Sequence, residues 1–140
     1  MDYNLQRFLD AQNQMYMRAL SEIKRGRKES HWMWFIFPQL KGLGQSDTAK
    51  YYAISGLREA AAFLKHPVLG KHLIEISEAM LTIRSKSVHE IFGHPDDLKL
   101  CSSMTLFANV ENSSIVFHSI IDRYFCGLQD EATLRFLNKL

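Results

Sequence analysis

Several polar residues of the sequence stand among strongly apolar neighbours, where their burial would be costly unless each has a partner. They occur in two stretches, 31–46 and 96–105, and comprise His31, Gln39, Ser46, Asp96, Asp97, Lys99, Ser102, Ser103 and Thr105. One interpretation is structural: Asp96 binds the free amides at the start of its own helix, Lys99 is solvated, and the hydroxyls bond helix carbonyls. The other is that these groups line a ligand pocket. The residue types alone leave both interpretations open.

The segment HWMWFIFPQLKGLGQS, residues 31–46, is unusually aromatic for a soluble protein. Trp32, Trp34, Phe35 and Phe37 supply flat faces, and a pocket that combines such faces with a few polar groups suits a base or a nicotinamide ring. On the residue types alone, a hydrophobic core is the favoured interpretation of these side chains. The two glycines that follow indicate only that the backbone bends or comes close to something.

Metal and nucleophile chemistry are not indicated by the spacing of the candidate residues. None of the six histidines forms an i, i+4 pair or an HExxH motif, and no GxSxG motif is present. Cys101 and Cys126 are too few and too far apart for a metal motif or a disulfide framework, so we expect two buried thiols in a reducing compartment. Gly42 and Gly44 lack the strand–turn–helix context of a dinucleotide fingerprint.

The composition of the chain bounds its class. Its 140 residues, of which 46% are hydrophobic and 23% charged, have the balance of one globular domain over residues 1–140. A net charge of +2 gives no general argument for a nucleic-acid partner. No apolar run approaches the roughly 18 residues of a membrane span, and the amphipathic N-terminus is unlike a signal peptide. We therefore expect a cytoplasmic protein without a membrane partner.

Hydrophobic periodicity predicts helices along most of the chain. Helical spacing runs from Leu5 to Ile23, and the basic residues that follow, 24–28, are favoured by the helix dipole and otherwise solvated on the structural interpretation. The aromatic segment is expected to be extended or irregular, because Phe37 precedes a proline. Residues 49–54 are either one helical turn or a short strand. Ser55 is expected to cap a helix over residues 57–65.

Further helix signals follow along the second half of the chain. Pro67 suits the first position of a helix that ends near Ile83, and residues 87–90 have the form of a capping box before a short helix. Helices are also predicted from Pro95 to 108, over 115–125, and after Asp130. About seven helices predict a compact all-α single domain, with an aromatic extended segment and a glycine loop after the first helix.

Three blocks of the sequence resemble, in order, the signature blocks of a family of small uncharacterised bacterial proteins that are often mislabelled as calpastatin. These blocks are HWMWFIFPQLKGLGQS (31–46), EAAAFLKHPVLGKHL (59–73) and IFGHPDDLKLCSSMTLF (91–107). The resemblance covers nearly the whole chain and implies a mostly helical fold, but it brings no established activity. The calpastatin label does not fit, because calpastatin is disordered and this chain is too apolar for that.

A second resemblance points to the NADAR proteins. The segment FLDAQ (8–12) looks like their Tyr-Phe-Gln-Ala-Gln helix, and AFLKHPVL (62–69) looks like their Lys-Phe-x-Gln-His-Pro-x-Leu segment. NADAR proteins are metal-independent N-glycosidases that act on ADP-ribose linked to guanine bases and on related ribose-phosphate compounds. Where those proteins carry an acidic pair before Trp-Gly, this chain offers Glu90 and, after Gly93, Asp96 and Asp97.

The NADAR resemblance implies a hydrolase that needs no cofactor and acts on a nucleotide or ADP-ribose-type ligand, with nucleic acid only as a modified substrate. A carboxylate, Asp97 or else Glu90, would stabilise the ribose charge or activate water, and His31 would serve the leaving base. Phosphates would contact Lys99, Arg27 or Lys28. The implied substrate-binding residues are Gln12, Trp32, Trp34, Gln39, Gly42, Gly44, Ser46, Lys99, Ser103 and Thr105.

Two alternatives to an N-glycosidase stay open at this point. A non-catalytic module would bind the same kind of ligand without a carboxylate facing it. A protein-interaction domain would instead expose Trp32 and Trp34 as hot spots on a convex surface. The oligomeric state is not predicted by the sequence.

Overall fold

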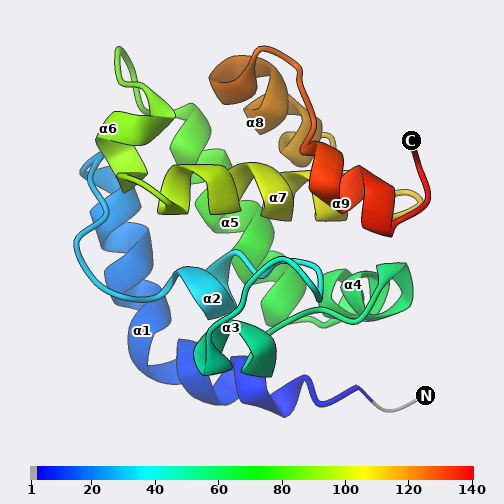
Figure 1. Cartoon of the computed structure of the whole chain (residues 1–140). Coiled ribbons are helices and arrows are strands. Elements are labelled where there is room, and N and C mark those ends of the chain that lie inside the picture. The colour runs from blue at the N-terminus through cyan, green and yellow to red at the C-terminus, as the bar shows by residue number, and fades with distance from the viewer. Residues whose placement is uncertain (1–2) are drawn as a thin grey trace.

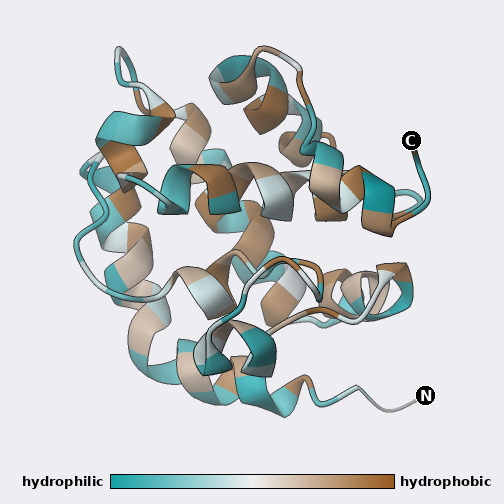
Figure 2. Cartoon of the chain, viewed as in Figure 1, coloured by the Kyte–Doolittle hydropathy of each residue, from teal (hydrophilic) through white to brown (hydrophobic). Residues whose placement is uncertain are grey.

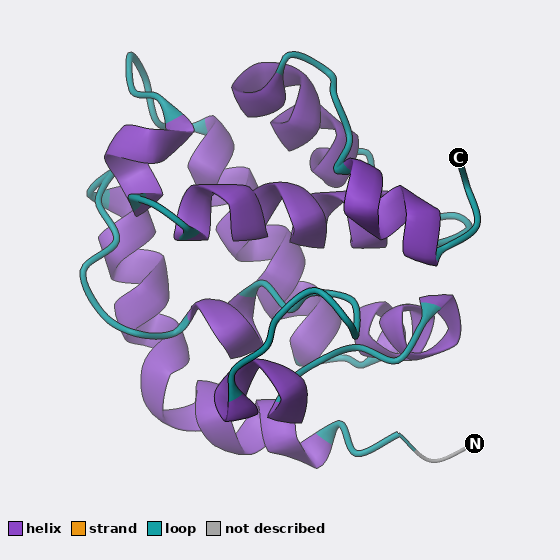
Figure 3. Ribbon diagram, in the orientation of Figure 1, coloured by secondary structure: helices purple, strands orange, loops and turns teal. Residues whose placement is uncertain are grey.

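The computed structural model describes residues 3–140, which fold into helices joined by short loops, without a strand in that range (Figure 3). The nine helices of these residues, two more than predicted, are α1 (Gln6–Lys24), α2 (Met33–Ile36), α3 (Asp47–Tyr51), α4 (Leu57–Lys65), α5 (Leu69–Leu81), α6 (Val88–Phe92), α7 (Asp96–Ala108), α8 (Val116–Phe125) and α9 (Glu131–Phe136). The two additional helices, α2 and α3, are one-turn elements, which are too short to show a hydrophobic period. For α3 the sequence had left open one helical turn or a short strand.

Helix α7 runs through the middle of the molecule and packs against α4, α6, α8 and α9 (Figure 1). Helix α5 packs behind it, between α1, α4 and α8. A row of aromatic rings connects α4, α7 and α8. The ring centroid of Phe107 on α7 lies 5.4 Å from that of Phe63 on α4 and 5.8 Å from that of Phe117 on α8. Hydropathy follows the packing, since several helices carry a hydrophobic stripe on one side and hydrophilic residues on the other (Figure 2).

Local capping explains where several helices begin, as the sequence predicts. Ser87 and Glu90 form a full capping box at α6, in which the Ser87 hydroxyl accepts from the Glu90 amide at 3.1 Å. Asp130 accepts from the Thr133 amide at 2.9 Å and begins α9. Ser46, which we predicted as a ligand contact, caps α3 through the Ala49 amide.

The aromatic segment is helical over Met33–Ile36, so the prediction of an extended or irregular conformation was wrong there. The turn buries Met33, Phe35 and Ile36, and this burial stabilises a helix whose four residues have no marked periodicity. It ends at Phe37, as the following proline predicts. Residues 49–54 combine both predicted forms, because α3 is followed by an isolated parallel bridge between Leu40 and Ile54.

A buried ion pair ties the start of α1 to α4. The Arg7 guanidinium lies 2.9 Å from the Glu59 carboxylate, and the two side chains are 8% and 4% exposed. Glu59 also accepts from the Ser55 amide at 2.8 Å. We had predicted that Ser55 caps α4. This prediction was wrong, because Gly56 occupies the N-cap position and no side chain caps the helix. Similarly, Pro67 lies two residues before α5 rather than at its first position.

None of the helices in residues 3–140 combines the length and the hydrophobicity that crossing a bilayer would need.

Gly70 provides a test of the close packing between α4 and α5. A Cβ added at this buried glycine would lie 2.0 Å from the Leu64 carbonyl oxygen. Although alanine favours a helix by about 1 kcal/mol over glycine, the clash has to be relieved by separating the two helices. We expect Gly70→Ala to lower the free energy of unfolding by about 2 kcal/mol in urea denaturation.

Gly56→Ala is the control for this substitution, because a Cβ there meets nothing within 4 Å and its extended backbone suits any residue. An unfolding free energy for Gly70→Ala equal to that of Gly56→Ala would contradict the proposed contact.

Candidate functional site

The carboxylate of Glu22, near the end of α1, organises the loop that leads to α2. It is 2% exposed and accepts four hydrogen bonds, from the Glu29 amide at 2.8 Å, the Ser30 amide at 2.9 Å, the Ser30 hydroxyl at 2.6 Å and Trp32 Nε1 at 2.9 Å. Burial would raise the pKa of Glu22, but these bonds outweigh it and lower the pKa to about 2. Glu22 is therefore ionised at neutral pH, and the loop is fastened to it.

The two tryptophans differ in what they can contact. Trp32 is fully buried between Phe37 and Phe92, with its nitrogen on Glu22, so its ring cannot stack on a ligand in this structure. Trp34 is half-buried, and the Lys99 ammonium lies 5.5 Å from its ring centroid. A convex interaction surface built on both rings is excluded by the burial of Trp32. Of the predicted aromatic wall, Trp34 alone has an accessible indole.

Two lysines share one carboxylate beside the tryptophans. Asp96 lies 2.9 Å from Lys28 Nζ and 3.7 Å from Lys99 Nζ. Lys28 is also 4.9 Å from the Trp32 ring and donates to the Ser30 carbonyl at 2.6 Å, and its side chain is only 8% exposed. We call these five residues, Lys28, Trp32, Trp34, Asp96 and Lys99, the lysine–tryptophan cluster. Its two cations share the carboxylate of Asp96.

The cluster changes how two predicted residues are understood. The structural interpretation of Asp96 as a cap for its own helix was wrong, because both of its oxygens face lysines and the N-cap residue, Pro95, makes no side-chain bond. Lys28 was expected only as a solvated or phosphate-binding residue of a basic run. Its ion-pair partner, Asp96, lies 68 residues away in sequence, and no local pattern specifies that contact.

The hydroxyls of α7 divide into two groups. Ser102 donates to the Leu98 carbonyl at 3.3 Å, and Thr105 accepts from the Asp130 amide at 2.9 Å, so both have structural partners. The Ser103 hydroxyl is completely buried and has no hydrogen-bond partner among the described residues. It lies one turn after Lys99 on the same helix, so the buried polar group belongs to the strip of α7 that carries the cluster.

Asp97 is held by two histidines that we had not assigned to the site. Its carboxylate lies 3.2 Å from His89 Nδ1 and 3.3 Å from His94 Nδ1, and its side chain is 13% exposed. Both imidazoles are exposed to solvent. The sequence places His89 and His94 five residues apart across the Gly93 turn, and we had weighed the histidines only as metal ligands.

The other two predicted catalytic residues make no hydrogen bond or ion pair with Asp97 among the described residues. Glu90 belongs to the α6 capping box, and these bonds to Ser87 lower the pKa of its carboxyl. His31 is exposed and follows the loop that Glu22 holds. The structure therefore offers His89 and His94 as the imidazoles beside the predicted carboxylate.

Gln12 lies in a separate polar network between α1, α2 and α5. Its Nε2 donates to the Phe35 carbonyl at 2.8 Å, and its Oε1 lies 2.8 Å from His72 Nδ1. The His72 ring stacks on Tyr16 at 3.6 Å, and the Tyr16 hydroxyl bonds the Glu75 carboxylate. Burial raises the pKa of Tyr16, aided by Glu75, and burial also lowers the pKa of His72. Because both ends of the Gln12 amide are engaged, the amide serves as a link between helices.

The predicted glycine loop packs against its own chain. A Cβ at Gly44 would lie 2.5 Å from the Ala49 Cβ, and one at Gly42 would lie 3.4 Å from the Phe136 ring at a backbone φ of +101°. Intrachain packing thus accounts for both glycines without a ligand. Gln39 is half-buried, and its carbonyl accepts from the Ile54 amide at 2.9 Å.

The structure also tests the expectations about the two cysteines and about metal binding. Cys126 is exposed and Cys101 is half-buried, so the prediction of two buried thiols was wrong. Burial raises the pKa of Cys101 to about 11, which leaves it a thiol at neutral pH. In residues 3–140, no three His, Cys, Asp or Glu side chains come together in a metal-binding arrangement.

Replacing Glu22 tests whether its carboxylate holds the loop. Since its pKa falls from 4.5 to about 2 on folding, ionisation of Glu22 stabilises the protein above pH 4.5, and this contribution is lost as the pH falls through 2. We expect the difference in unfolding free energy between the native protein and Glu22→Gln to narrow by about 2 kcal/mol from pH 6 to pH 3 in urea denaturation. A difference that stays constant with pH would contradict this role.

Comparisons with known proteins place the chain in a family without a known activity. Residues 2–137 match a family described as a protein of unknown function, DUF1810. The crystal structure of the conserved hypothetical protein Rv1873 from Mycobacterium tuberculosis is similar, with a TM-score of 0.95, 46% identity and coverage of 97% of both chains. No curated protein matches at a significant level, and these matches give no support to the NADAR resemblance or the calpastatin label. The chain belongs to the DUF1810 family of proteins of unknown function.

Proposed function

We propose that the lysine–tryptophan cluster binds a nucleotide-type ligand and that Asp97 assists hydrolysis of its N-glycosidic bond without a metal. The observation that carries this proposal is the pair of lysines that share Asp96 beside the half-buried ring of Trp34. A ribose phosphate supplies the anion for the lysines, and its base supplies an aromatic face for Trp34.

The unused donors of the cluster support binding of an anion. Each ammonium has three N–H groups, so a phosphate can bind Lys28 and Lys99 through the donors that Asp96 and the Ser30 carbonyl do not use. Lys28 is nearly buried, and its contacts with Trp32 and Ser30 fix its position before any ligand arrives. The buried Ser103 hydroxyl, which has no partner among residues 3–140, adds a polar group to the same strip of α7.

The chemical step assigned to Asp97 follows from the charge that develops on the sugar. As the bond from C1′ to the base nitrogen breaks, its electron pair leaves with the base and positive charge grows on the ribose. Asp97 would stabilise that charge or accept a proton from the water whose oxygen bonds C1′. An imidazolium of His89 or His94 would give a proton to the departing nitrogen. The resemblance of residues 8–12 and 62–69 to NADAR proteins supports this reaction class.

A non-catalytic binding module is the second candidate, and one observation favours it. Both oxygens of Asp97 are already engaged, by His89, His94 and the Leu98 amide at 2.8 Å. A carboxylate so fully bonded is well suited to joining α6 to α7. The two candidates share the ligand site and differ only in turnover.

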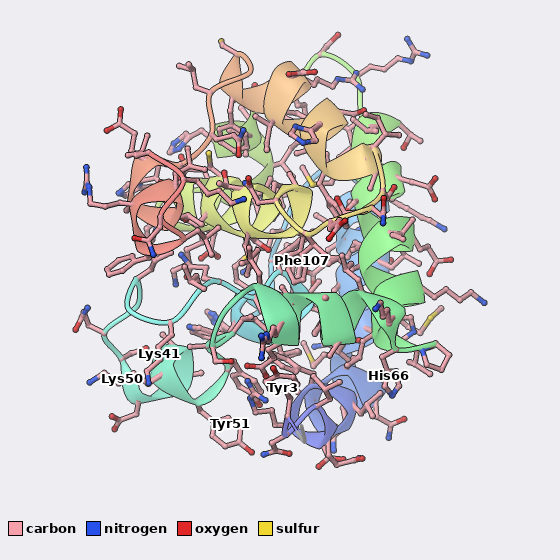
Figure 4. The ribbon with its side chains drawn as sticks, turned by 90° about the vertical axis from the view of Figure 1, so that its right-hand side faces the viewer. Tyr3, Lys41, Lys50, Tyr51, His66 and Phe107 are labelled. Atoms are coloured by element: carbon pink, nitrogen blue, oxygen red, sulfur yellow. The ribbon has the colours of Figure 1, made fainter. Side chains whose placement is uncertain are left out.

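Binding is tested by measuring the melting temperatures of the native protein, Lys99→Ala and Lys50→Ala. Each protein is measured with and without ADP-ribose, NAD, GMP or ribose 5-phosphate. A ligand that binds only the folded state raises the melting temperature. At a ligand concentration of 100 times its Kd, it raises the free energy of unfolding by about 2.7 kcal/mol. We expect a rise for the native protein and Lys50→Ala and a much smaller one for Lys99→Ala. Lys50 is the control because it lies exposed on α3 (Figure 4). No rise with any of the four compounds would contradict the binding site.

Turnover is tested by chromatography of the base released from the ligand that binds. Asp97→Asn keeps the size of the side chain and removes its charge, so we expect release to fall by about 100-fold or more. The ligand-induced rise in melting temperature should persist in this variant. Ligand binding without base release by the native protein would instead establish the non-catalytic module.

A further inference from the structure

A groove of about 610 Å³ lies between α4 and the loop that joins α7 to α8, and none of its lining residues belongs to the lysine–tryptophan cluster. Apolar side chains contributed by α4, α5 and the start of that loop form its floor, namely Leu57, Ala61, Leu64, Ile74 and Val110. The side of the molecule on which α4 lies below α7 faces the viewer in Figure 4. The volume falls within the range of sites for small organic ligands, roughly 300–1,000 Å³.

The apolar face of helix α4 is wider than the core covers. Ala60 and Phe63 are completely buried. Beside them on the helix, Leu57, Ala61 and Leu64 follow the i, i+4, i+7 spacing of a stripe that packs against the core and is only partly buried. This lateral stripe therefore leaves apolar surface in contact with water inside the groove.

The rim of the groove is positively charged. Arg58 and Lys65, at the two ends of α4, and Lys139, near the C-terminus, line it and are all exposed. None of the three makes an ion pair or a side-chain hydrogen bond with the residues described, 3–140. The rim carries one carboxylate, Glu111, so three cations stand against one anion.

We propose that this groove binds a small anionic amphiphile, a molecule with an aliphatic or aromatic body and one carboxylate or sulfonate group. The body would cover the lateral stripe of α4 and remove its exposed part from water, which is favourable in proportion to the apolar area buried. The anionic group would lie at the rim, where Arg58 and Lys65 have no other partner. The charge excess of the rim argues against a neutral or cationic amphiphile.

The proposal is tested with two anionic probes at 0.15 M salt. The fluorescence of 1-anilinonaphthalene-8-sulfonate rises in apolar sites, and decanoate then serves as a non-fluorescent competitor, with decanol as its uncharged analogue. We expect saturable one-to-one binding of the dye, displaced by decanoate at a concentration about tenfold or more below that required for decanol.

Charge reversal at the rim separates the groove from general surface binding. We expect Arg58→Glu combined with Lys65→Glu to weaken binding of the dye by about tenfold. The control is Lys41→Glu combined with Lys50→Glu, which makes the same charge change at exposed positions on and before α3 (Figure 4). We expect the control pair to leave the affinity for the dye within about twofold of that of the native protein. Ala61→Trp fills the floor of the groove without changing its charge, and it should weaken binding of the dye to a similar extent.

Three results would overturn the proposal: equal weakening by the two charge-reversed pairs, unchanged affinity in Ala61→Trp, or displacement by decanol as readily as by decanoate. The melting temperature of each variant shows that it is folded before the dye is added. Because the groove shares no residue with the lysine–tryptophan cluster, either site can fail its test without affecting the other.

Discussion

The hydrogen bonds to Glu22 are the constraint on which the arrangement of the proposed site depends. An ionised carboxylate that is 2% exposed is stable only if its lone pairs are satisfied, and here two backbone amides, one hydroxyl and one indole satisfy them. All four donors belong to residues 29–32. The loop between α1 and α2 is therefore fastened to Glu22, and Lys28 within it lies over Trp32 and against Asp96.

The buried polar groups of the fold fall into two kinds. Arg7 with Glu59, and Gln12 with His72, join helices and have their bonding capacity largely used within the chain. The lysine–tryptophan cluster differs because its two cations share a single carboxylate, and because Trp34 and Lys99 are both partly accessible. A ligand can add bonds to this second kind of group without breaking the packing of helices, and for that reason we place the function there.

The sequence predicts those parts of the structure whose causes are local. The capping box at Ser87, the cap at Asp130 and the helix over residues 57–65 follow from neighbouring residues, and all three are found. Trp32, Glu22 and Asp96 show the limit, since their roles come from partners brought together only by the fold. An aromatic residue beside polar ones has the same pattern whether its ring faces a ligand or, as for Trp32, a buried carboxylate. The sequence analysis placed Trp34 and Lys99 in one binding site, but it did not predict that two lysines share Asp96.

The most direct test of the account uses the two tryptophans as internal reporters. In a ¹⁵N-labelled sample each indole Nε1–H gives one resonance, and the chain has two tryptophans. On titration with the nucleotide that raises the melting temperature, we predict a saturable shift of the Trp34 indole resonance and a much smaller one for Trp32, whose Nε1 stays on Glu22. Saturation of binding with the Trp34 resonance unmoved would contradict the account, because the ligand would then occupy another part of the surface.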